Sequence, residues 1–323
     1  MMQVMRVMMT AIVVAAMVMA CAPLVVGQEA AEDTATPQTP APQEAAGDAA
    51  AAEGDDAAAG EAAVEDDDAA AGDATAADGD DAAAAAAAAA DTDRVTDGLV
   101  ALYLFDEAIG DALITDQVRP VDGLELLLRG GEANAAVSLR DGAAHFGVIE
   151  TEIPGLFSVG PATELVQTLQ FSGRLTLETW LTPATNTAAG PARIVSISRD
   201  ASTRNITLGQ TQDHYILRLR TSATNVQGTP ELEGPEGTLL AGELQHLVVT
   251  FDGWTTVMYL DGEPIAETEH FGGTLEGWDD TMSLILGNEF NGERLWSGAI
   301  HLVAIYSYAL APEQVLSNYE AGF

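Results

Sequence analysis

The chain has 323 residues, of which 50 are acidic and 12 are basic, and its formal net charge at pH 7 is −38. This charge excludes nucleic-acid binding by phosphate neutralisation, because that mode needs a positive protein surface. The single cysteine, Cys21, excludes a disulfide framework, a thiolate zinc site and a CxxCH haem attachment. All aromatic residues lie at or after Tyr103, so a folded core is expected only in the later part of the chain.

Residues 1–27 have the layout of an export signal, with a charge at Arg6, an apolar run and small residues near Cys21. The sequence VMAC at 18–21 resembles a bacterial lipobox, in which the cysteine is acylated and becomes the first mature residue. Two other outcomes stay open: cleavage after Gly27, giving a free exported protein, or retention of the apolar run as a membrane anchor. We expect a cell-envelope lipoprotein, periplasmic or extracellular, that meets a membrane only through this anchor.

Residues 28–97 predict a disordered, acidic, alanine-rich linker. From Gln28 to Asp93 there are 19 acidic residues, with no basic and no aromatic residue. Such a composition cannot bury enough apolar area to offset the entropy of ordering. Because like charges extend the segment, we expect a spacer that holds the following domain away from the surface to which the chain is attached.

Residues 98–323 predict an all-β domain, an antiparallel β-sandwich of the jelly-roll type, with two small domains as the alternative. Short β-favouring runs recur with turn residues between them, which is typical of a sandwich. The runs lie at 99–105, 174–181, 192–198, 214–220, 244–251, 255–261, 282–287 and 299–306. Helices are predicted only at 162–170 and at 312–320, where a proline suits the first helical turn.

The pattern inside several runs predicts how they are placed. In 174–181 the three leucines lie on one face with Thr179, and Thr176, Glu178 and Trp180 lie on the other, so one side of the strand is expected to be core. The run 299–306 is apolar on both faces and is expected to be central in its sheet. Asp-Gly pairs at 252–253 and 261–262 predict two consecutive hairpins.

Four stretches carry a resemblance to a known family. They read GLVALYLFDEAIGD at 98–111, LTLETWLTP at 175–183, ELQHLVVTFDGWTTVMYLDGEPIAE at 243–267 and LGN…WSGAIHLVAIYSYALAPEQVLSNYEAG at 286–322. They resemble the laminin-G-like, concanavalin A-like lectin/glucanase jelly roll of exported bacterial proteins, over essentially all of 98–323. The resemblance implies two stacked, curved antiparallel sheets. It leaves the function open, because this fold carries lectins, hydrolases, calcium-dependent adhesion modules and passive spacers.

We expect no enzymatic activity. The glucanase branch of this family places its carboxylates at alternate positions of one strand, as Glu-x-Asp-x-Glu or a close variant, and no predicted strand here contains that pattern. Glu231, Glu233 and Glu236 have the nearest spacing, but the prolines and glycines around them oppose a rigid strand. The alternatives are a glycoside-active enzyme with a rearranged carboxylate pair and a structural spacer without a ligand.

Four residues predict a sugar-binding surface if they share the open face of one sheet. They are Glu178, Trp180, Arg218 and Arg220. An aromatic ring packs against the C–H faces of a sugar while charged groups bond its hydroxyls. In the alternative interpretation, Glu178 pairs with an arginine and a loop covers Trp180.

Calcium is the one cofactor that the loops suggest. An acidic rim, Asp279 and Asp280 with Asn288 and Glu289 a strand away, offers the hard oxygen ligands that calcium prefers. Against this, relatives often have Gly-x-Ile-Asp in the last strand where this chain has His301, and imidazole is a poor calcium ligand.

The sequence thus predicts a non-catalytic exported binding module whose partner is a glycan or a surface protein. The two histidines within predicted strands, His246 and His301, are expected to pack inside the sandwich with one hydrogen bond each.

Overall fold

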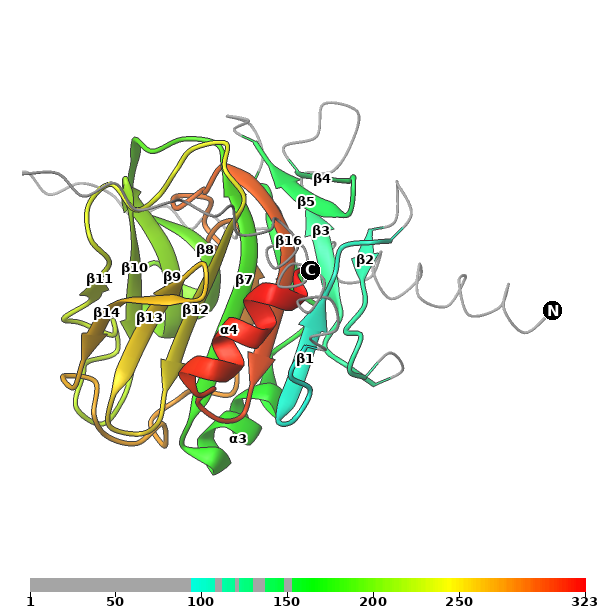
Figure 1. The fold of residues 1–323 in the computed structure, drawn as a ribbon. Coiled ribbons are helices and arrows are strands. Elements are labelled where there is room, and N and C mark those ends of the chain that lie inside the picture. The colour runs from blue at the N-terminus through cyan, green and yellow to red at the C-terminus, as the bar shows by residue number, and fades with distance from the viewer. Residues whose placement is uncertain (1–93, 108–111, 120–121, 130–136, 148–152) are drawn as a thin grey trace, which may run out of the picture. The chain divides into compact units, whose positions relative to one another are not determined.

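The computed structural model describes residues 94–107, 112–119, 122–129, 137–147 and 153–323. The predicted leader with Cys21 and the acidic segment up to Asp93 lie outside the described residues. Within these ranges the chain forms two antiparallel eight-stranded sheets and two helices (Figure 1), as the sandwich prediction requires. Neither of these helices is long and apolar enough to cross a membrane.

The first sheet contains the predicted central strand. In spatial order it consists of β14 (Glu263–Thr268), β13 (Thr256–Leu260), β12 (Gln245–Phe251), β7 (Leu175–Pro183), β16 (Gly298–Tyr306), β5 (Ala143–Phe146) and β4 (Val137–Arg140), with β1 (Leu99–Tyr103) also paired to β16. β16 lies between β7 and β5, so its predicted central position is confirmed. β12, β13 and β14 are consecutive hairpins, and Asp261 and Gly262 in the second turn have φ angles of 51° and 85°.

The second sheet consists largely of strands that periodicity did not reveal. In spatial order it contains β11 (Leu232–Glu233), β10 (His214–Leu219), β9 (Thr203–Gln212), β8 (Ala188–Asp200), β15 (Ser283–Leu286), β6 (Gly155–Ser158), β3 (Leu126–Arg129) and β2 (Leu113–Ile114). Several of these strands have two to four residues, too few for an alternating pattern to stand out. β9 is longer, but it alternates polar residues with two core residues, Ile206 and Leu208.

The main core lies between the two sheets. Leu175, Leu177 and Leu181 of β7 point into it, as their alternation predicts. Large aromatic side chains such as Tyr103 and Trp296 fill the space and are fully buried. The Trp296 Nε1 donates a hydrogen bond to Gln210 Oε1 at 2.9 Å, which satisfies the one polar atom of this ring.

The two helices are close to their predicted positions. α3 (Thr163–Ser172) ends at Gly173, whose φ of 66° is the left-handed conformation that glycine adopts without strain. α4 (Pro312–Ala321) begins at the expected proline. Figure 1 shows α4 lying across the outer face of the first sheet, over β7 and its neighbours.

A second apolar cluster fills the space beneath α4. Val315 of the helix packs with Trp180, Val248 and Tyr306, which point outward from the sheet. The expectation that only one side of 174–181 is core is therefore wrong, whereas 299–306 is apolar on both faces as predicted. A strand's own alternation could not show this, because the covering helix comes from the far end of the chain.

The folded domain begins earlier than residue 98. Arg94 Nη1 contacts Glu178 Oε1 at 2.5 Å, and the Val95 backbone N donates a hydrogen bond to Asn318 Oδ1 at 2.8 Å. The last residues of the predicted linker, 94–97, thus belong to the domain, because polar groups of β7 and α4 bind them.

Candidate functional site

Glu178 lies on the covered outer face of the first sheet, and its side chain is fully buried. It accepts hydrogen bonds from Arg94 Nη1 at 2.5 Å, His246 Nε2 at 2.9 Å, Tyr306 Oη at 3.1 Å and Asn318 Nδ2 at 2.8 Å. Burial by itself raises the pKa of Glu178, but the hydrogen bond from His246 and the charge of Arg94 outweigh burial and hold the pKa below its usual value. This carboxylate is a structural anchor and is closed to a ligand.

Trp180 is only 6% exposed, so it offers no platform for a sugar. Its ring stacks on Tyr319 of α4 with centroids 5.7 Å apart, and on His246 with centroids 4.7 Å apart. His246 therefore packs against the outer face beneath α4 rather than between the two sheets, where the sequence placed it.

Arg218 lies near the end of β10 in the other sheet, and Arg220 directly follows that strand. Arg218 Nε donates to Glu231 Oε2 at 2.6 Å, and the Arg220 carbonyl accepts a hydrogen bond from the Trp278 indole at 2.6 Å. The four predicted sugar-binding residues thus do not share one open face. Strand alternation indicates a face, but long-range pairing decides which strands form one sheet, and it separates β7 from β10.

The acidic residues of the predicted calcium rim are bound by other side chains of the protein. Asp279 contacts Arg199 at 2.5 Å, and Asp280 accepts a hydrogen bond from Gln167 at 2.8 Å. On the other side of β15, Glu289 accepts a hydrogen bond from Ser198 at 2.8 Å.

Asn288 completes the set, and it donates to the Pro154 carbonyl at 2.8 Å. No cluster of three or more potential metal ligands occurs among the residues that the structure describes. Arginine, amide and hydroxyl groups occupy the positions at which the sequence placed a cation.

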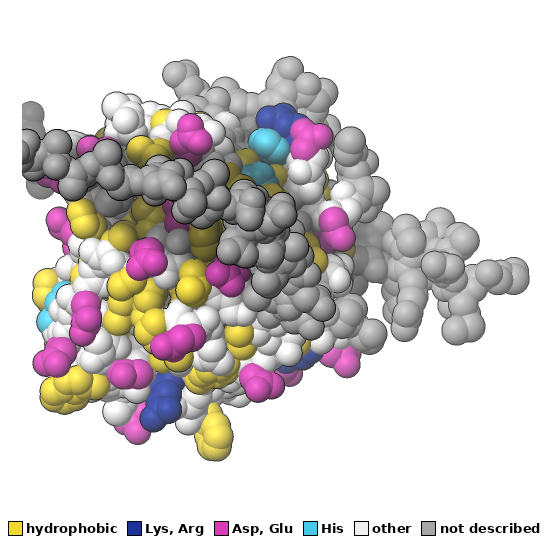
Figure 2. Space-filling model, in the orientation of Figure 1, with side chains coloured by type: hydrophobic (Ala, Val, Ile, Leu, Met, Phe, Trp, Pro, Cys, Tyr) yellow, Lys and Arg dark blue, Asp and Glu magenta, His cyan; other side chains and the backbone are white. Residues whose placement is uncertain are grey.

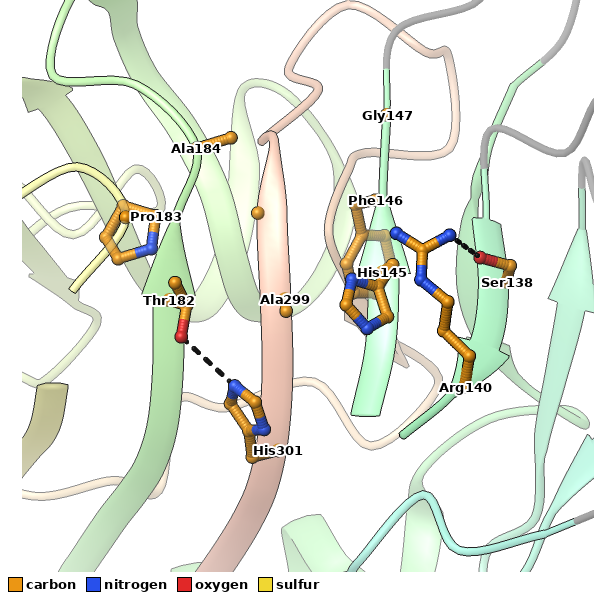
Figure 3. Close-up of a pocket in the computed structure, with 12 residues that line it drawn as sticks. Ser138, Arg140, His145, Phe146, Gly147, Thr182, Pro183, Ala184, Ala299 and His301 are labelled. Atoms are coloured by element: carbon orange, nitrogen blue, oxygen red, sulfur yellow. Dashed lines mark hydrogen bonds between the residues drawn. The ribbon is translucent and has the colours of Figure 1, made fainter. Parts of the chain in front are cut away.

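A hollow of about 380 Å³ opens at the end of the first sheet where β4 and β5 lie. Its polar lining is Ser138 and Arg140 from β4, His145 from β5, Thr182 from β7 and His301 from β16. Figure 3 shows these side chains around Ala299, with hydrogen bonds joining Arg140 to Ser138 and His301 to Thr182. Figure 2 shows histidine and basic side chains gathered at this end of the face.

Strand register explains how these residues meet. Ser138 pairs with His145, His145 with Ala299, and Ala299 with Thr182, so one row crosses four strands. Ala299 has the smallest side chain of the row, which leaves space above it. The pairing of β16 with β7 shifts at His301, and this β-bulge directs the imidazole toward the same side.

Both histidines of the hollow favour the neutral form. Burial lowers the pKa of His301 and the nearby His145 lowers it further, while burial and the charge of Arg140 lower the pKa of His145. Thr182 Oγ1 lies 3.1 Å from His301 Nε2. Among the described residues, His145 Nε2 and His301 Nδ1 are buried without a hydrogen-bond partner. A neutral imidazole both donates and accepts, so such a ring can bond a hydroxyl group, as His301 does with Thr182.

The sequence contained one signal for this hollow. VSLRDGAAHF at 137–146 is an Asp-Gly hairpin, and Asp141 and Gly142 have φ angles of 54° and 69°. A two-residue turn places Ser138 opposite His145. The contributions of β7 and β16 were not predictable, because they depend on pairing across more than 100 residues.

Comparison with known proteins supports the fold. Residues 161–316 match the family model described as the concanavalin A-like lectin/glucanases superfamily, and no curated protein sequence matches the chain. A Trypanosoma rangeli sialidase in complex with 2,3-difluorosialic acid is similar with a TM-score of 0.52 and 16% identity, over 70% of this chain and 33% of the sialidase. The binding domain of botulinum neurotoxin serotype D/C is similar with a TM-score of 0.52 and 11% identity, over 70% of this chain and 52% of that one.

A further structure of the toxin binding domain, in complex with rat synaptotagmin II, has a TM-score of 0.51 and 10% identity over the same shares. This chain thus spans about a third of the sialidase and about half of the toxin domain. At these identities the likeness shows a shared fold and nothing about the ligand.

Proposed function

Because residues 161–316 belong to the concanavalin A-like lectin/glucanases superfamily, we propose that the chain is a non-catalytic binding module that holds a glycan in the hollow of the first sheet. The observation that carries this proposal is the row Ser138, His145, Ala299 and Thr182, which gathers hydrogen-bonding groups around a small residue. Pockets for small ligands combine such a concave surface with a few convergent polar groups.

The chemistry of the lining suits a sugar. The two neutral imidazoles and two hydroxyl groups can each donate and accept, as sugar hydroxyls do, and Arg140 adds a cationic donor. The Phe323 ring lies 4.8 Å from the His301 ring and is 55% exposed, so it offers an apolar face for sugar C–H groups.

The non-catalytic part of the proposal rests on the same lining. Hydrolysis of a glycosidic bond requires two carboxyl groups at a set separation. The described residues that line the hollow include neither aspartate nor glutamate. Binding without turnover is therefore the activity that this set of side chains supports best.

We further propose that the domain works in the cell envelope, presented on the acidic segment by a lipid-anchored Cys21. A surface protein is the alternative partner, since the toxin binding domain of similar fold is described in complex with rat synaptotagmin II. A glycan array distinguishes the two, because a domain that binds only a protein would bind no glycan on it.

The test is a glycan array probed with the full chain, with and without calcium, followed by titration of the best glycan. We expect Arg140→Ala and His145→Ala each to weaken binding by about tenfold or more, because a lost hydrogen bond to a charged or buried group costs about 1.5–3 kcal/mol. Exposed residues of the same types, Arg174→Ala and His270→Ala, are the matched controls and should leave affinity unchanged.

Three results would overturn the proposal. Release of reducing sugar would show an enzyme, and equal affinity of the hollow variants and the controls would place the site elsewhere. An array without any bound glycan would leave a protein partner or a passive spacer as the function of the domain.

A further inference from the structure

Trp254 exposes a large aromatic ring to solvent. Of the four tryptophans, which all lie in the described residues, Trp254 is 63% exposed and the other three are at most 6% exposed. A second exposed ring, Phe171, lies at the same end of the domain. It is close to Gly173, whose carbonyl oxygen is 3.7 Å from the position of a Cβ at Gly253. Exposed apolar groups gathered at one place often mark a binding site.

The ring lies at the opposite end of the first sheet from the hollow. Gly173 precedes β7, whereas Thr182, near the other end of this nine-residue strand, lines the hollow. Nine residues of extended strand span about 30 Å. Figure 1 shows α3 and the end of β12 at one end of the sheet, with β4 and β5 at the other. A ligand on Trp254 would therefore occupy a site separate from the hollow.

Hydrogen bonds fix the turn that carries Trp254. Asp252 Oδ1 accepts from the backbone N of Trp254 at 2.8 Å and from that of Thr255 at 2.7 Å. The Gly273 N donates to the Gly253 carbonyl at 3.0 Å, which ties the turn to the loop after β14. Because the turn is already ordered, a ligand that binds to it pays little for ordering the protein.

The indole ring lies against backbone. A Cβ at Gly272 would be 3.5 Å from Trp254 Cε3 and 3.3 Å from the Trp254 carbonyl oxygen. Gly253 and Gly273 adjoin the ring and have no side chains that could cover it. The exposed ring and the glycines around it thus form a flat surface, which we call the Trp254 platform.

Two exposed carboxylates border the Trp254 platform. They belong to Asp252, two residues before the tryptophan, and to Glu269, whose carbonyl oxygen is 3.1 Å from the same Cβ position at Gly272. Among the described residues, neither carboxylate takes part in an ion pair. Their oxygens, apart from the one that Asp252 uses within the turn, are available to accept hydrogen bonds from a ligand.

We propose that the Trp254 platform is a second binding site and that its ligand is an uncharged glycan. A sugar ring packs its C–H face on an aromatic ring, and its hydroxyl groups donate to carboxylates at the edge. The domain from residue 98 has 30 acidic residues and ten arginines, a net charge of −20, which repels an anionic sugar. Two backbone N–H groups already bind Asp252 Oδ1, which weakens its attraction for a cation. This site is independent of the function proposed for the hollow.

The first test measures how far acrylamide quenches the tryptophan fluorescence of the full chain. Acrylamide reaches chiefly Trp254, because the other three rings are buried. The probes are neutral hexasaccharides of glucose, xylose, mannose and N-acetylglucosamine. We expect at least one of them to lower the quenching constant by about twofold or more, because a stacked sugar covers the ring. His145→Ala, in the hollow, should keep this protection, so the two sites are told apart.

Variants in the His145→Ala background test the ring itself by calorimetric titration of the protecting hexasaccharide. Trp254→Leu keeps an apolar side chain but loses the flat ring, and it should weaken affinity by about tenfold or more, whereas Trp254→Phe should retain most of it. Glu269→Ala should weaken affinity by about fivefold or more. Glu263→Ala, an exposed glutamate at the other end of β14, is the matched control and should have no effect.

Three results would overturn this inference. Protection by none of the hexasaccharides would refute a glycan site at Trp254. Protection only by phosphatidylcholine vesicles or only by a hexa-arginine peptide would replace the glycan with a lipid surface or a basic protein. Equal affinity of Trp254→Leu and its parent for the hexasaccharide would place the sugar away from this ring.

Discussion

Glu178 is the residue that joins the outer parts of the domain to the first sheet. Its four hydrogen-bond donors come from the N-terminal segment, β12, β16 and α4. A buried ion pair adds little stability compared with an apolar pair of the same size, but breaking it leaves an unpaired charge. The sequence interpretation that Glu178 pairs with an arginine was correct, although the covering element is α4 and the arginine comes from residue 94.

We predict that Glu178→Gln lowers the free energy of unfolding by about 3–5 kcal/mol, because Arg94 then loses its counter-charge. Urea unfolding at pH 7 measures this loss. Glu313→Gln, on the exposed side of α4, is the control and should change stability by less than about 0.5 kcal/mol.

The same residue predicts a pH dependence. The pKa of Glu178 is lower in the folded state than its usual value, so its stabilisation is complete above pH about 4.3 and is lost as the pH falls through the folded pKa. As the pH is lowered from 5, the free energy of unfolding of the wild-type protein should therefore fall more than that of Glu178→Gln. Parallel curves for the two proteins would contradict the assignment.

Among the elements, α4 decides which face of the first sheet is available. It turns a surface with an aromatic ring and a carboxylate into a second core, while the hollow near β4 and β5 lies beside the covered area. The turn between β13 and β14 supports this helix. A Cβ at Gly262 would lie 3.0 Å from Leu316 and 3.2 Å from Tyr319, which both belong to α4.

We predict that Gly262→Ala destabilises the domain more than Gly237→Ala does. Both glycines have left-handed φ angles, 85° and 78°, so each substitution costs about 1–2 kcal/mol in the backbone. Only the alanine at Gly262 also displaces α4, which adds about 1 kcal/mol, whereas nothing lies within 4 Å of a Cβ at Gly237. Thermal unfolding of the two variants checks the difference. Equal losses of stability would show that α4 can move away from the new Cβ without cost.

At the scale of the whole molecule, negative charge dominates, because 50 acidic residues outnumber 12 basic ones. Of the arginines in the described residues, several hold single carboxylates: Arg94 with Glu178, Arg119 with Glu164, Arg199 with Asp279 and Arg218 with Glu231. The exposed pairs among them contribute little stability.

The layout of the whole chain carries the remaining prediction. The leader predicted to end at Cys21 and the acidic spacer predicted after it would suit a domain that is held by a lipid and kept apart from an anionic membrane surface. Mass spectrometry of the mature protein should find a diacylglyceryl cysteine at its first residue. A mature N-terminus at Gln28 would instead indicate a free exported protein.

The sequence by itself determined the fold class, because strand periodicity, Asp-Gly turns and the proline before α4 are local properties. It also indicated the outward direction of Glu178, and it contained the unpredicted Asp-Gly turn of the hairpin that carries His145. Only the tertiary structure decided which strands share a sheet and that α4 covers Trp180. These features depend on register, on single-residue bulges and on contacts across more than 100 residues, and local patterns contain no information about such pairings.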